Sequence, residues 1–527
     1  MRTVHELEVR SDRAVGNPFA DVAVDATFTN ERGDEHTVPA FYDGDGRWRV
    51  RFSPDAPGRW SYHVHSRPSG YGFEQSGTFA VEEAKTRGYL TATPGRAWGF
   101  HVESGEPVFI LGDTVYNLFG MAHCGIDVAP FLRRRAAQGF NLLRVRLPVS
   151  PFHPPDGYNQ WQTRGTWPWG GSEQAPRFDR FNLDYFRTVD RVVHLAEDLG
   201  LGLEMIMEAW GFEFPFNSRQ IFVPEWEELW LRYLIARYDA YSCVWIWTPM
   251  NEYEYYPNGD WHYKPVASRW AMRIARWIKG VAPHGHIVAM HNGPREPAFA
   301  TRFAADPDAI DAIMFQEWGS RGAEDGWLAA GIEEQIDRGL AGWSGSAVFA
   351  EYGYERNPDL PLLMPSHEWC NAEHTRRGAW RGAFRGLGVV HGFENSWGPF
   401  AVLDRDQAGL PYLLHPRRFF TEVLPFHRLR PLQRLATGHL PDSGHDASVL
   451  ASEVGDLVAV YFPTGGAVEI TLPRHTTYRA VWFDPRTGET HEASPLAGGD
   501  LVQVATPVGG ESSADDWVLA LSAPSPV

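Results

Sequence analysis

The sequence contains few cysteines and no excess of positive charge. Its 527 residues include three scattered cysteines, Cys124, Cys243 and Cys370, whose spacing predicts neither a disulfide framework nor a metal centre. The formal net charge of -18 at pH 7 argues against a surface that binds nucleic acid or an anionic membrane. The acidic balance favours solubility but does not identify a partner.

Long apolar segments are also absent. The sequence has no run of about eighteen apolar residues, so we expect no membrane span. The first residues, Met1 to Glu8, lack the apolar core of a signal peptide. The expected location is therefore the cytoplasm.

Aromatic side chains, in contrast, are abundant. They make up 14% of the chain and include 22 tryptophans, which could be core residues or exposed platforms for sugar rings. The length exceeds what one hydrophobic core usually supports, so we expect about two to four domains.

The two ends of the chain are predicted to be β-sandwiches. Within residues 1–85, apolar and polar residues alternate from Val22 to Phe28, as in strands with one buried face. The turn from Asp43 to Gly46 lacks the distal glutamate of a calcium loop, so we interpret it as a hairpin. Residues 431–527 lose helical periodicity, and strand-like segments such as Leu457 to Phe462 predict the second sandwich.

Between these ends, residues 86–430 alternate strand-like and helix-like segments. One helix is expected to begin at the N-cap Asn182 and to end at Gly200. Tryptophans in the helical segments are expected to pack between helices and strands. The predicted strands are Val108–Asp113, Asn141–Pro148, Leu201–Glu208, Val244–Glu252, His286–His291, Ala312–Glu317, Ala347–Glu351 and Val389–Glu394. This pattern predicts an α/β fold, a (β/α)8 TIM barrel. The rival, an open doubly wound sheet, usually has a glycine-rich phosphate turn after its first strand, which is missing here.

Catalytic groups in such a barrel lie at the carboxyl ends of the strands. The first strand has no His-x-His pair, which argues against a metal-dependent hydrolase. No predicted strand ends on lysine, which argues against Schiff-base chemistry, and the glycine-rich loops of a phosphate site are not seen. We therefore expect no metal and no cofactor. A glycosidase needs two carboxylates across the mouth of the barrel, and this requirement is met.

The fourth strand ends on Asn251 and Glu252, and the seventh ends on Glu351. On facing strands the two carboxylates would lie about 5 Å apart, the separation of a retaining glycosidase. Glu252 is predicted to be the general acid/base, because burial and its negative neighbour would raise its pKa. Glu351 is predicted to be the nucleophile, kept ionised by hydrogen bonds and by Arg144 or Arg146.

Other side chains at the mouth are predicted to bind the sugar. Asn251 would donate to the hydroxyl beside the reacting carbon, and Trp397 would form a floor under the ring. The long segment from Pro151 to Arg180, with Trp161, Trp167 and Trp169, is predicted to form a wall of the cleft. The predicted substrate-binding residues are Asp113, Asn117, Arg146, Glu208, Trp210, Asn251, His291, Glu317, Trp318, Tyr352, Glu394 and Trp397.

Several of these residues have structural alternatives. The two carboxylates could be members of structural ion pairs, and Glu254 is a competing acid two residues beyond Glu252. Glu317 and Glu394 could be buried partners of arginine. His291 could be a core histidine.

The same motifs carry a resemblance to a known family. The Asn-Glu pair and the later glutamate resemble clan A of the retaining glycoside hydrolases, and Leu111 to Thr114 resembles the start of the apiosidase-like barrel. The segment from Asn17 to Trp60 is similar to an Ig-like domain that often precedes such barrels, and Trp482 to Gly488 resembles the sandwich that often follows. Apiosidases use an aspartate as acid where this chain has Glu252, so the resemblance does not imply that the sugar is apiose.

These observations predict a retaining glycoside hydrolase that cleaves a small oligosaccharide or glycoside by double displacement. A transglycosylase would use the same residues, and a non-catalytic carbohydrate-binding barrel is the rival from another class. The expected partner is a carbohydrate substrate. The sandwiches could cover the barrel or build a homo-oligomer.

Overall fold

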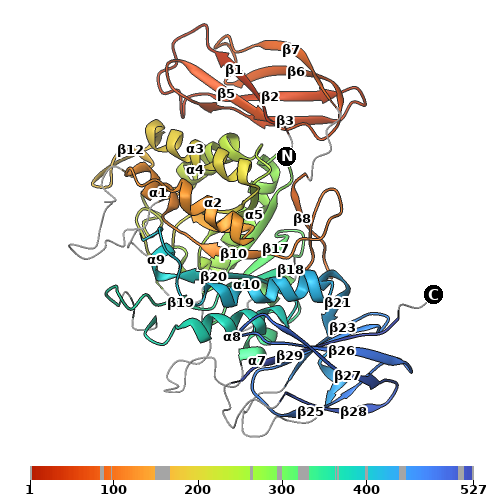
Figure 1. Ribbon diagram of the computed structural model, residues 1–527. Helices are drawn as coiled ribbons and strands as arrows, with labels where there is room; N and C mark the ends of the chain where they lie inside the picture. Colours follow the sequence, from red (N-terminus) through yellow and green to blue (C-terminus); the bar gives the residue numbers. More distant parts are fainter. Residues whose placement is uncertain are drawn as a thin grey trace.

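The computed structural model has a closed barrel between two regions of β-sheet (Figure 1). This arrangement confirms the predicted TIM barrel with flanking sheet domains. The structure describes residues 3–82, 88–95, 98–148, 166–260, 265–293, 300–304, 306–318, 332–362, 364, 367–397, 402–437, 447–507 and 515–524. None of the helices in these ranges has the length and apolar character needed to cross a membrane.

The N-terminal region consists of two antiparallel sheets around an apolar core that includes Phe28, Val50 and Trp60. The Asp43 N–H donates to the Arg47 carbonyl at 2.9 Å, so the predicted hairpin turn is present. The strands are β1 His5–Arg10, β2 Ala23–Asn30, β3 Glu35–Pro39, β4 Phe41–Tyr42, β5 Arg47–Phe52, β6 Gly58–Arg67 and β7 Gln75–Val81.

Eight parallel strands in the described chain form the barrel, which closes where β10 pairs with β20. They are β10 Leu111–Thr114, β11 Leu142–Arg146, β14 Gly202–Glu208, β15 Val244–Met250, β16 Ile287–His291, β17 Ala312–Gln316, β18 Ser346–Glu351 and β20 Gly388–Phe393. Apolar residues such as Ile246, Met314 and Val348 fill the interior. A hairpin of β8 (Leu90–Ala92) and β9 (Phe100–Val102) packs into the same cluster. The apolar filling leaves the carboxyl ends of the strands as the place for polar chemistry.

Helices surround the barrel, and α3 begins and ends as predicted. The Asn182 side chain accepts from the Tyr185 N–H, and Gly200 ends the helix with a φ of 68°. The helices are α1 Leu118–His123, α2 Ala129–Gln138, α3 Leu183–Leu199, α4 Pro224–Tyr238, α5 Pro265–Val281, α6 Thr301–Ala304, α7 Ile332–Gly339, α8 Ala372–Ala383, α9 Glu394–Trp397 and α10 Leu410–Arg418. Shorter elements are β12 Trp169–Ser172, β13 Ala175–Phe181, β19 Tyr354–Glu355, η1 Tyr253–Tyr255, η3 Phe419–Val423, η4 Phe426–Arg428 and η5 Gln433–Leu435.

Tryptophans of this region act as core residues where the structure describes them. Trp230 of α4 is fully buried and donates to the Met207 carbonyl at 2.9 Å. The Trp169 ring lies 4.6 Å from the Trp230 ring and is also buried. Trp169 therefore packs inside the protein and does not line a cleft as predicted. Trp161 lies outside the described residues.

The C-terminal region is a second pair of sheets, and the larger sheet has two buried faces. Val458 and Val460 face the smaller sheet, whereas Tyr461 and Phe483 belong to the apolar core that the barrel and its helices share. This region therefore packs directly on the barrel (Figure 1). Its strands are β21 Leu429–Pro431, β22 Ala436–Thr437, β23 Ser448–Ser452, β24 Leu457–Phe462, β25 Ala467–Thr471, β26 Thr477–Phe483, β27 Thr490–Ala497, β28 Leu501–Ala505 and β29 Trp517–Ser522.

A buried ion network joins the N-terminal sheets to the barrel helices. Arg51 of β5 and Arg237 of α4 lie 3.1 Å and 2.8 Å from the Asp190 carboxylate of α3. Arg237 also lies 3.1 Å from the Asp43 carboxylate of the N-terminal hairpin. Removing one partner would leave a buried charge without compensation, so this network fixes the sheets on the helices.

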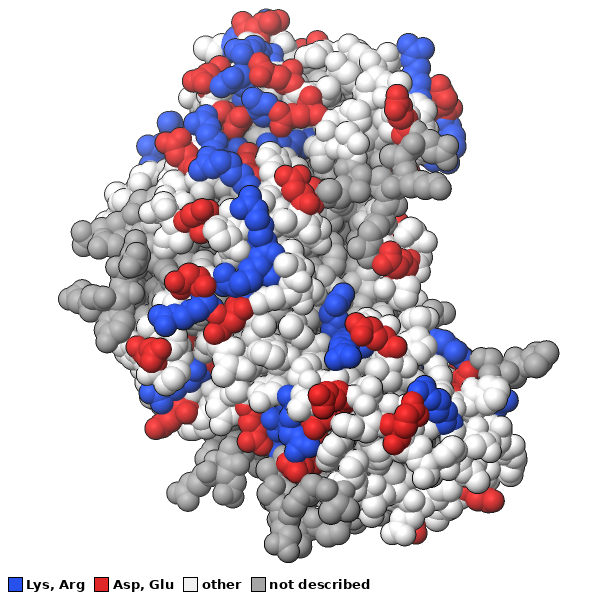
Figure 2. All heavy atoms as spheres, viewed as in Figure 1, with Lys and Arg blue, Asp and Glu red and all other residues white. Residues whose placement is uncertain are grey.

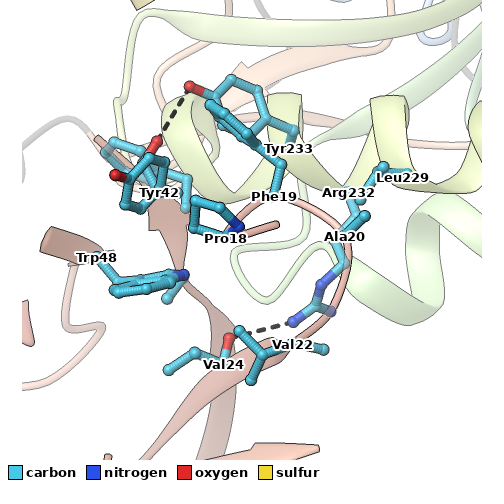
Figure 3. Close-up of a pocket in the computed structure, with 13 residues that line it drawn as sticks. Pro18, Phe19, Ala20, Val22, Val24, Tyr42, Trp48, Leu229, Arg232 and Tyr233 are labelled. Carbon is cyan, nitrogen blue, oxygen red and sulfur yellow. Dashed lines mark hydrogen bonds between the residues drawn. The ribbon is translucent and has the colours of Figure 1, made fainter. Parts of the chain in front are cut away.

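An apolar pocket of about 70 Å³ lies in the same seam. Figure 3 shows Phe19, Tyr42 and Trp48 of the N-terminal region facing Leu229 and Tyr233 of α4. The Tyr233 hydroxyl donates to the Tyr42 carbonyl at 3.3 Å. The pocket is thus part of the contact between two regions of the chain.

On the outer surface of the N-terminal sheets, Figure 2 shows acidic and basic side chains side by side.

Candidate active site

A β-bulge places Glu351 at the mouth of the barrel. Phe315 of β17 pairs with Phe349, but the next residue, Gln316, pairs with Glu351, so Ala350 is the extra residue of the bulge. Bulges re-aim the side chain that follows them. The Ala350 side chain joins the apolar interior, and the Glu351 carboxylate faces the same polar layer as Gln316.

Four side chains surround the Glu351 carboxylate. Tyr354 donates its hydroxyl to Oε1 at 2.6 Å, and Tyr116 donates to Oε2 at 3.3 Å. Arg144 Nη1 lies 3.4 Å and His291 Nε2 3.3 Å from Oε2. Burial opposes ionisation of Glu351, but His291, the Arg144 charge and the Tyr354 hydroxyl together hold its pKa below the usual range. Glu351 is therefore a carboxylate at neutral pH.

Arg144 is the hub of this polar layer. It is fully buried, donates to Glu204 at 2.7 Å and donates to the Asn251 side-chain oxygen at 2.8 Å. Of the two arginines predicted to hold Glu351, Arg144 makes the contact. Glu204 is thus the ion-pair partner of Arg144 in the barrel interior.

Glu252 is the second residue after β15 and adopts an unusual backbone conformation. Its φ of 52° and ψ of 63° lie in the left-handed region, which a non-glycine residue adopts at a cost of about 1 kcal/mol or more. Its N–H donates to His291 Nδ1 at 3.2 Å. The acceptor role of Nδ1 leaves the His291 proton on Nε2, toward Glu351. Burial and the Arg144 charge lower the pKa of His291 to about 4, so the ring is neutral.

The two carboxyl groups have opposite pKa shifts. Burial and the negative charge of Glu351 raise the pKa of Glu252 well above its usual range, although a hydrogen bond with Gln316 opposes this. Glu252 keeps partial exposure, whereas the Glu351 side chain is buried. Environments that separate the pKa values of two neighbouring carboxyls define one acid and one base.

The neighbouring acid, Glu254, has different contacts. Its Oε2 accepts the Gly293 N–H at 2.9 Å, and its Oε1 lies 3.8 Å from Arg302. Glu254 is buried, and it ties the turn after β15 to the residues after β16. Glu254 thus has its own partners within the protein, and its charge adds to the effects of burial and of Glu351 that raise the pKa of Glu252.

Asn251 offers a hydrogen-bond donor to the mouth of the barrel. Its Oδ1 accepts from Arg144 at 2.8 Å, while its buried Nδ2 has no hydrogen-bond partner among the described residues. A buried donor without a partner is costly and calls for an explanation. A substrate hydroxyl would satisfy it.

Some predicted substrate ligands are instead engaged inside the protein. Asp113 accepts from Arg135 at 2.7 Å and from Ser396 at 3.1 Å. Glu394 accepts the Asn357 N–H at 2.9 Å and lies 3.0 Å from His367. Both carboxylates are fully buried. In this structure both carboxylates accept from internal donors, and their roles toward a sugar stay predictions.

Tyr352 also differs from its predicted role. Its hydroxyl donates to the Thr375 carbonyl of α8 at 3.4 Å, and its ring stacks on Phe349 at 4.9 Å. The side chain thus lies between the strand and α8, opposite the Glu351 carboxylate, as alternation along a strand requires. Tyr354 contacts the carboxylate instead, after the chain passes Gly353 with a φ of 128°.

The remaining predicted residues lie around the mouth. Trp210 and Trp397 form an apolar cluster with Tyr116 and Tyr354, and Trp318 packs against it. The Trp397 ring is buried 4.5 Å from the Tyr354 ring, so in this structure it supports a tyrosine that binds Glu351. The roles of these indoles toward a sugar stay predictions.

Glu317, Arg146 and Glu208 also contact other residues of the protein. The partly exposed Glu317 donates its N–H to the Glu351 carbonyl at 3.1 Å. Arg146 lies 3.3 Å from Glu213 and donates to the Asn117 oxygen at 3.4 Å. Glu208 pairs with Arg219 at 2.6 Å, and burial raises the pKa of Glu208 to about 8.

The prediction from sequence missed Tyr116 and Tyr354. Each lies three residues past a predicted strand end, so a search a little past each strand would have included them. Their contacts depend on the bulge at Ala350 and on the backbone at Gly353. Neither feature has a clear signal in the sequence.

A closed (β/α)8 barrel with two carboxyl groups at the carboxyl ends of its strands has the groups that a glycosidase requires. The comparison with protein families agrees. The model described as "Apiosidase-like, catalytic domain" matches residues 98–404, which is more than half of the chain. The chain belongs to this apiosidase-like family.

Solved structures share the fold at low sequence identity. A protein from Bacteroides vulgatus described as a "putative glycoside hydrolase" has a TM-score of 0.71 and 19% identity, and 98% of each chain is covered. A glycoside hydrolase family 5 protein from the same organism has a TM-score of 0.63 and 17% identity, with 83% of this chain and 94% of that chain covered. No curated protein matches the chain.

Family models also match both flanking regions. Residues 3–67 match a "Domain of unknown function (DUF5060)", and residues 435–522 match a "Putative collagen-binding domain of a collagenase". These matches are consistent with the two sheet regions that flank the barrel.

Proposed function

We propose that the protein is a retaining glycoside hydrolase that cleaves a small oligosaccharide or glycoside by double displacement. Glu351 is the nucleophile, and Glu252 is the general acid/base. The observation that carries the proposal is the placement of two carboxyls at strand ends, with Glu351 held by Arg144, His291 and Tyr354 and with Glu252 just beyond β15. Burial and a negative neighbour act on the pKa of Glu252, whereas Arg144, His291 and Tyr354 act on that of Glu351.

In the first step, a Glu351 oxygen attacks the anomeric carbon while the Glu252 carboxyl gives its proton to the leaving oxygen. The bond to the leaving group breaks, and its electron pair stays on that oxygen. A glycosyl ester on Glu351 results. The raised pKa keeps the proton on Glu252 before this step, and the lowered pKa keeps Glu351 ready to attack.

In the second step, the Glu252 carboxylate takes a proton from water. The hydroxide oxygen bonds to the anomeric carbon, and Glu351 leaves as a carboxylate. Neutralisation of Glu351 in the ester removes the charge that raised the pKa of Glu252. The pKa of Glu252 therefore falls in the ester, so the side chain that is protonated in the first step is ionised and acts as a base in the second without a change of position.

The test is a panel of 4-nitrophenyl pyranosides and furanosides of both anomers, assayed with wild type and with three variants. We expect one glycone to be turned over by wild type and by Glu254→Gln, the matched control for an adjacent buried carboxyl. Glu351→Gln should lose turnover while keeping the fold. Near-normal activity of Glu351→Gln would overturn the nucleophile assignment.

The acid/base role has its own test. Glu252→Ala should be slow on poor leaving groups and should be accelerated by azide on 4-nitrophenyl substrates, because a small anion can replace the missing base in the second step. The absence of both acceleration and a glycosyl azide product would argue against Glu252.

A transglycosylase would use the same two residues. Competition between water and added sugar acceptors distinguishes the two activities, because a transglycosylase transfers the glycone to the acceptor even in dilute solution. We favour hydrolysis. A non-catalytic barrel is disfavoured, because both carboxyls are present with the pKa shifts that catalysis needs.

A further inference from the structure

Three stacked groups lead outward from the candidate active site. The Arg146 guanidinium lies 4.4 Å from the centre of the Trp210 ring. The Phe212 ring stacks on Trp210 at 5.4 Å with an interplanar angle of 10°. Exposure rises from 5% at Trp210 to 36% at Phe212. Phe212 is therefore the solvent-exposed end of an ordered stack.

The stack is connected to both catalytic candidates. Tyr116, which donates to Glu351, packs edge-on against Trp210 at 5.4 Å. Phe212 contacts the Tyr255 ring at 5.0 Å, and the Tyr255 N–H donates to the Glu252 carbonyl at 3.1 Å. Trp210 is thus linked to Glu351 through Tyr116, and Phe212 is linked through Tyr255 to the turn that carries Glu252.

The backbone that carries Phe212 is held in place. Asn217 donates to the Phe212 carbonyl at 2.9 Å, and the Glu213 N–H donates to the Trp210 carbonyl at 2.9 Å. A Cβ on Gly211 would lie 2.8 Å from the backbone of Tyr255, and one on Gly259 would lie 2.7 Å from Phe212 Cα. The turns after β14 and β15 therefore fit closely against each other.

We propose that Phe212 is the binding platform for the leaving group of the substrate, and that this leaving group is itself a ring, a second sugar. The inference rests on the proposed function. Glu252 protonates the leaving oxygen, so the group beyond that oxygen extends past Glu252 and its turn. A fixed aromatic face at this place binds a ring without paying to order the side chain. An exposed apolar side chain beside a catalytic group is a typical ligand contact.

The experiment compares leaving groups on one glycone, the one that the panel identifies. The 4-nitrophenyl glycoside carries a ring as leaving group, and the glycosyl fluoride carries none. Phe212→Ala should lower kcat/KM for the 4-nitrophenyl glycoside about tenfold, the value of one aromatic contact. The same substitution should change kcat/KM for the glycosyl fluoride by no more than about twofold. Phe212→Trp keeps a platform and should keep both activities.

Ile221→Ala is the matched control, since Ile221 is 47% exposed in the same connection between β14 and α4. This substitution should leave kcat/KM unchanged for both substrates. An equal loss of kcat/KM on both substrates in Phe212→Ala, or no loss on either, would overturn the assignment of Phe212 as the platform for the leaving group. A wild-type enzyme that cleaves neither the fluoride nor the 4-nitrophenyl glycoside would instead overturn the proposed function.

Discussion

The Tyr354 hydroxyl donates the shortest hydrogen bond to Glu351. Removing this hydroxyl gives a quantitative prediction. Tyr354 is buried, and its oxygen lies 2.6 Å from Glu351 Oε1. Tyr354→Phe deletes that oxygen and keeps the ring. A hydrogen bond to a charged group contributes about 1.5–3 kcal/mol, and about 1.4 kcal/mol corresponds to one pH unit.

The sign follows from the state that the bond favours. The Tyr354 hydroxyl stabilises the carboxylate, so its loss raises the pKa of Glu351 toward the usual range. The acid limb of kcat/KM should therefore move to higher pH by about one to two units. The basic limb, which reports Glu252, should move much less.

Stability offers a second measurement. Because the folded pKa of Glu351 is lowered, its ionisation stabilises the fold above the usual pKa of glutamate, and this contribution is lost as the pH falls through the lowered folded pKa. Tyr354→Phe should therefore be less stable than wild type by about 1.5–3 kcal/mol at pH 7. The difference should shrink under acid conditions.

The assay is the pH profile of kcat/KM on the 4-nitrophenyl substrate, with chemical denaturation at pH 7 and at a pH near the lowered Glu351 pKa of about 2. Tyr352→Phe is the matched control, because its hydroxyl donates to the Thr375 carbonyl and does not contact Glu351. An unmoved acid limb in Tyr354→Phe, or an equal movement in the control, would refute the account of the lowered Glu351 pKa.

Two further predictions concern the same polar layer. Asn251→Ala should lower kcat/KM about 100-fold or more, as expected for a donor that acts in the transition state, and steady-state kinetics checks this; a loss confined to KM would contradict that role. Arg144→Met should destabilise the fold by about 3–5 kcal/mol, because it leaves Glu204 and Glu351 buried without their cation. Chemical denaturation measures this loss, and adding Glu204→Gln to the Arg144→Met variant should recover part of it. An Arg144→Met variant as stable as wild type would contradict the claim that Arg144 compensates these buried charges.

The barrel was predictable because its strands are buried on both faces. Such strands are short apolar runs that end on polar residues, as at Val244 to Glu252, and the observed strand ends lie within a few residues of the predicted ones. The placement of Asn251 and Glu252 after β15 and of Glu351 at the end of β18 follows from the same pattern.

The contacts of each carboxyl group were less predictable. Asp113, Glu394 and Glu351 all end apolar strands, but the first two meet internal donors such as Arg135 and His367. A strand end alone does not show whether a carboxylate is satisfied by the protein, because its partners come from distant parts of the chain. For Tyr352 and Tyr354, the choice of face depends on local backbone geometry.

The identity of the nucleophile is the central claim, and covalent trapping tests it most directly. The 2-deoxy-2-fluoro derivative of the active glycone, with a fluoride leaving group, should form a stable ester with the wild-type enzyme. Peptide mass spectrometry should then place one glycosyl group on Glu351. A label on Glu252, Glu254 or Glu208, or hydrolysis with inversion and no adduct, would contradict the account.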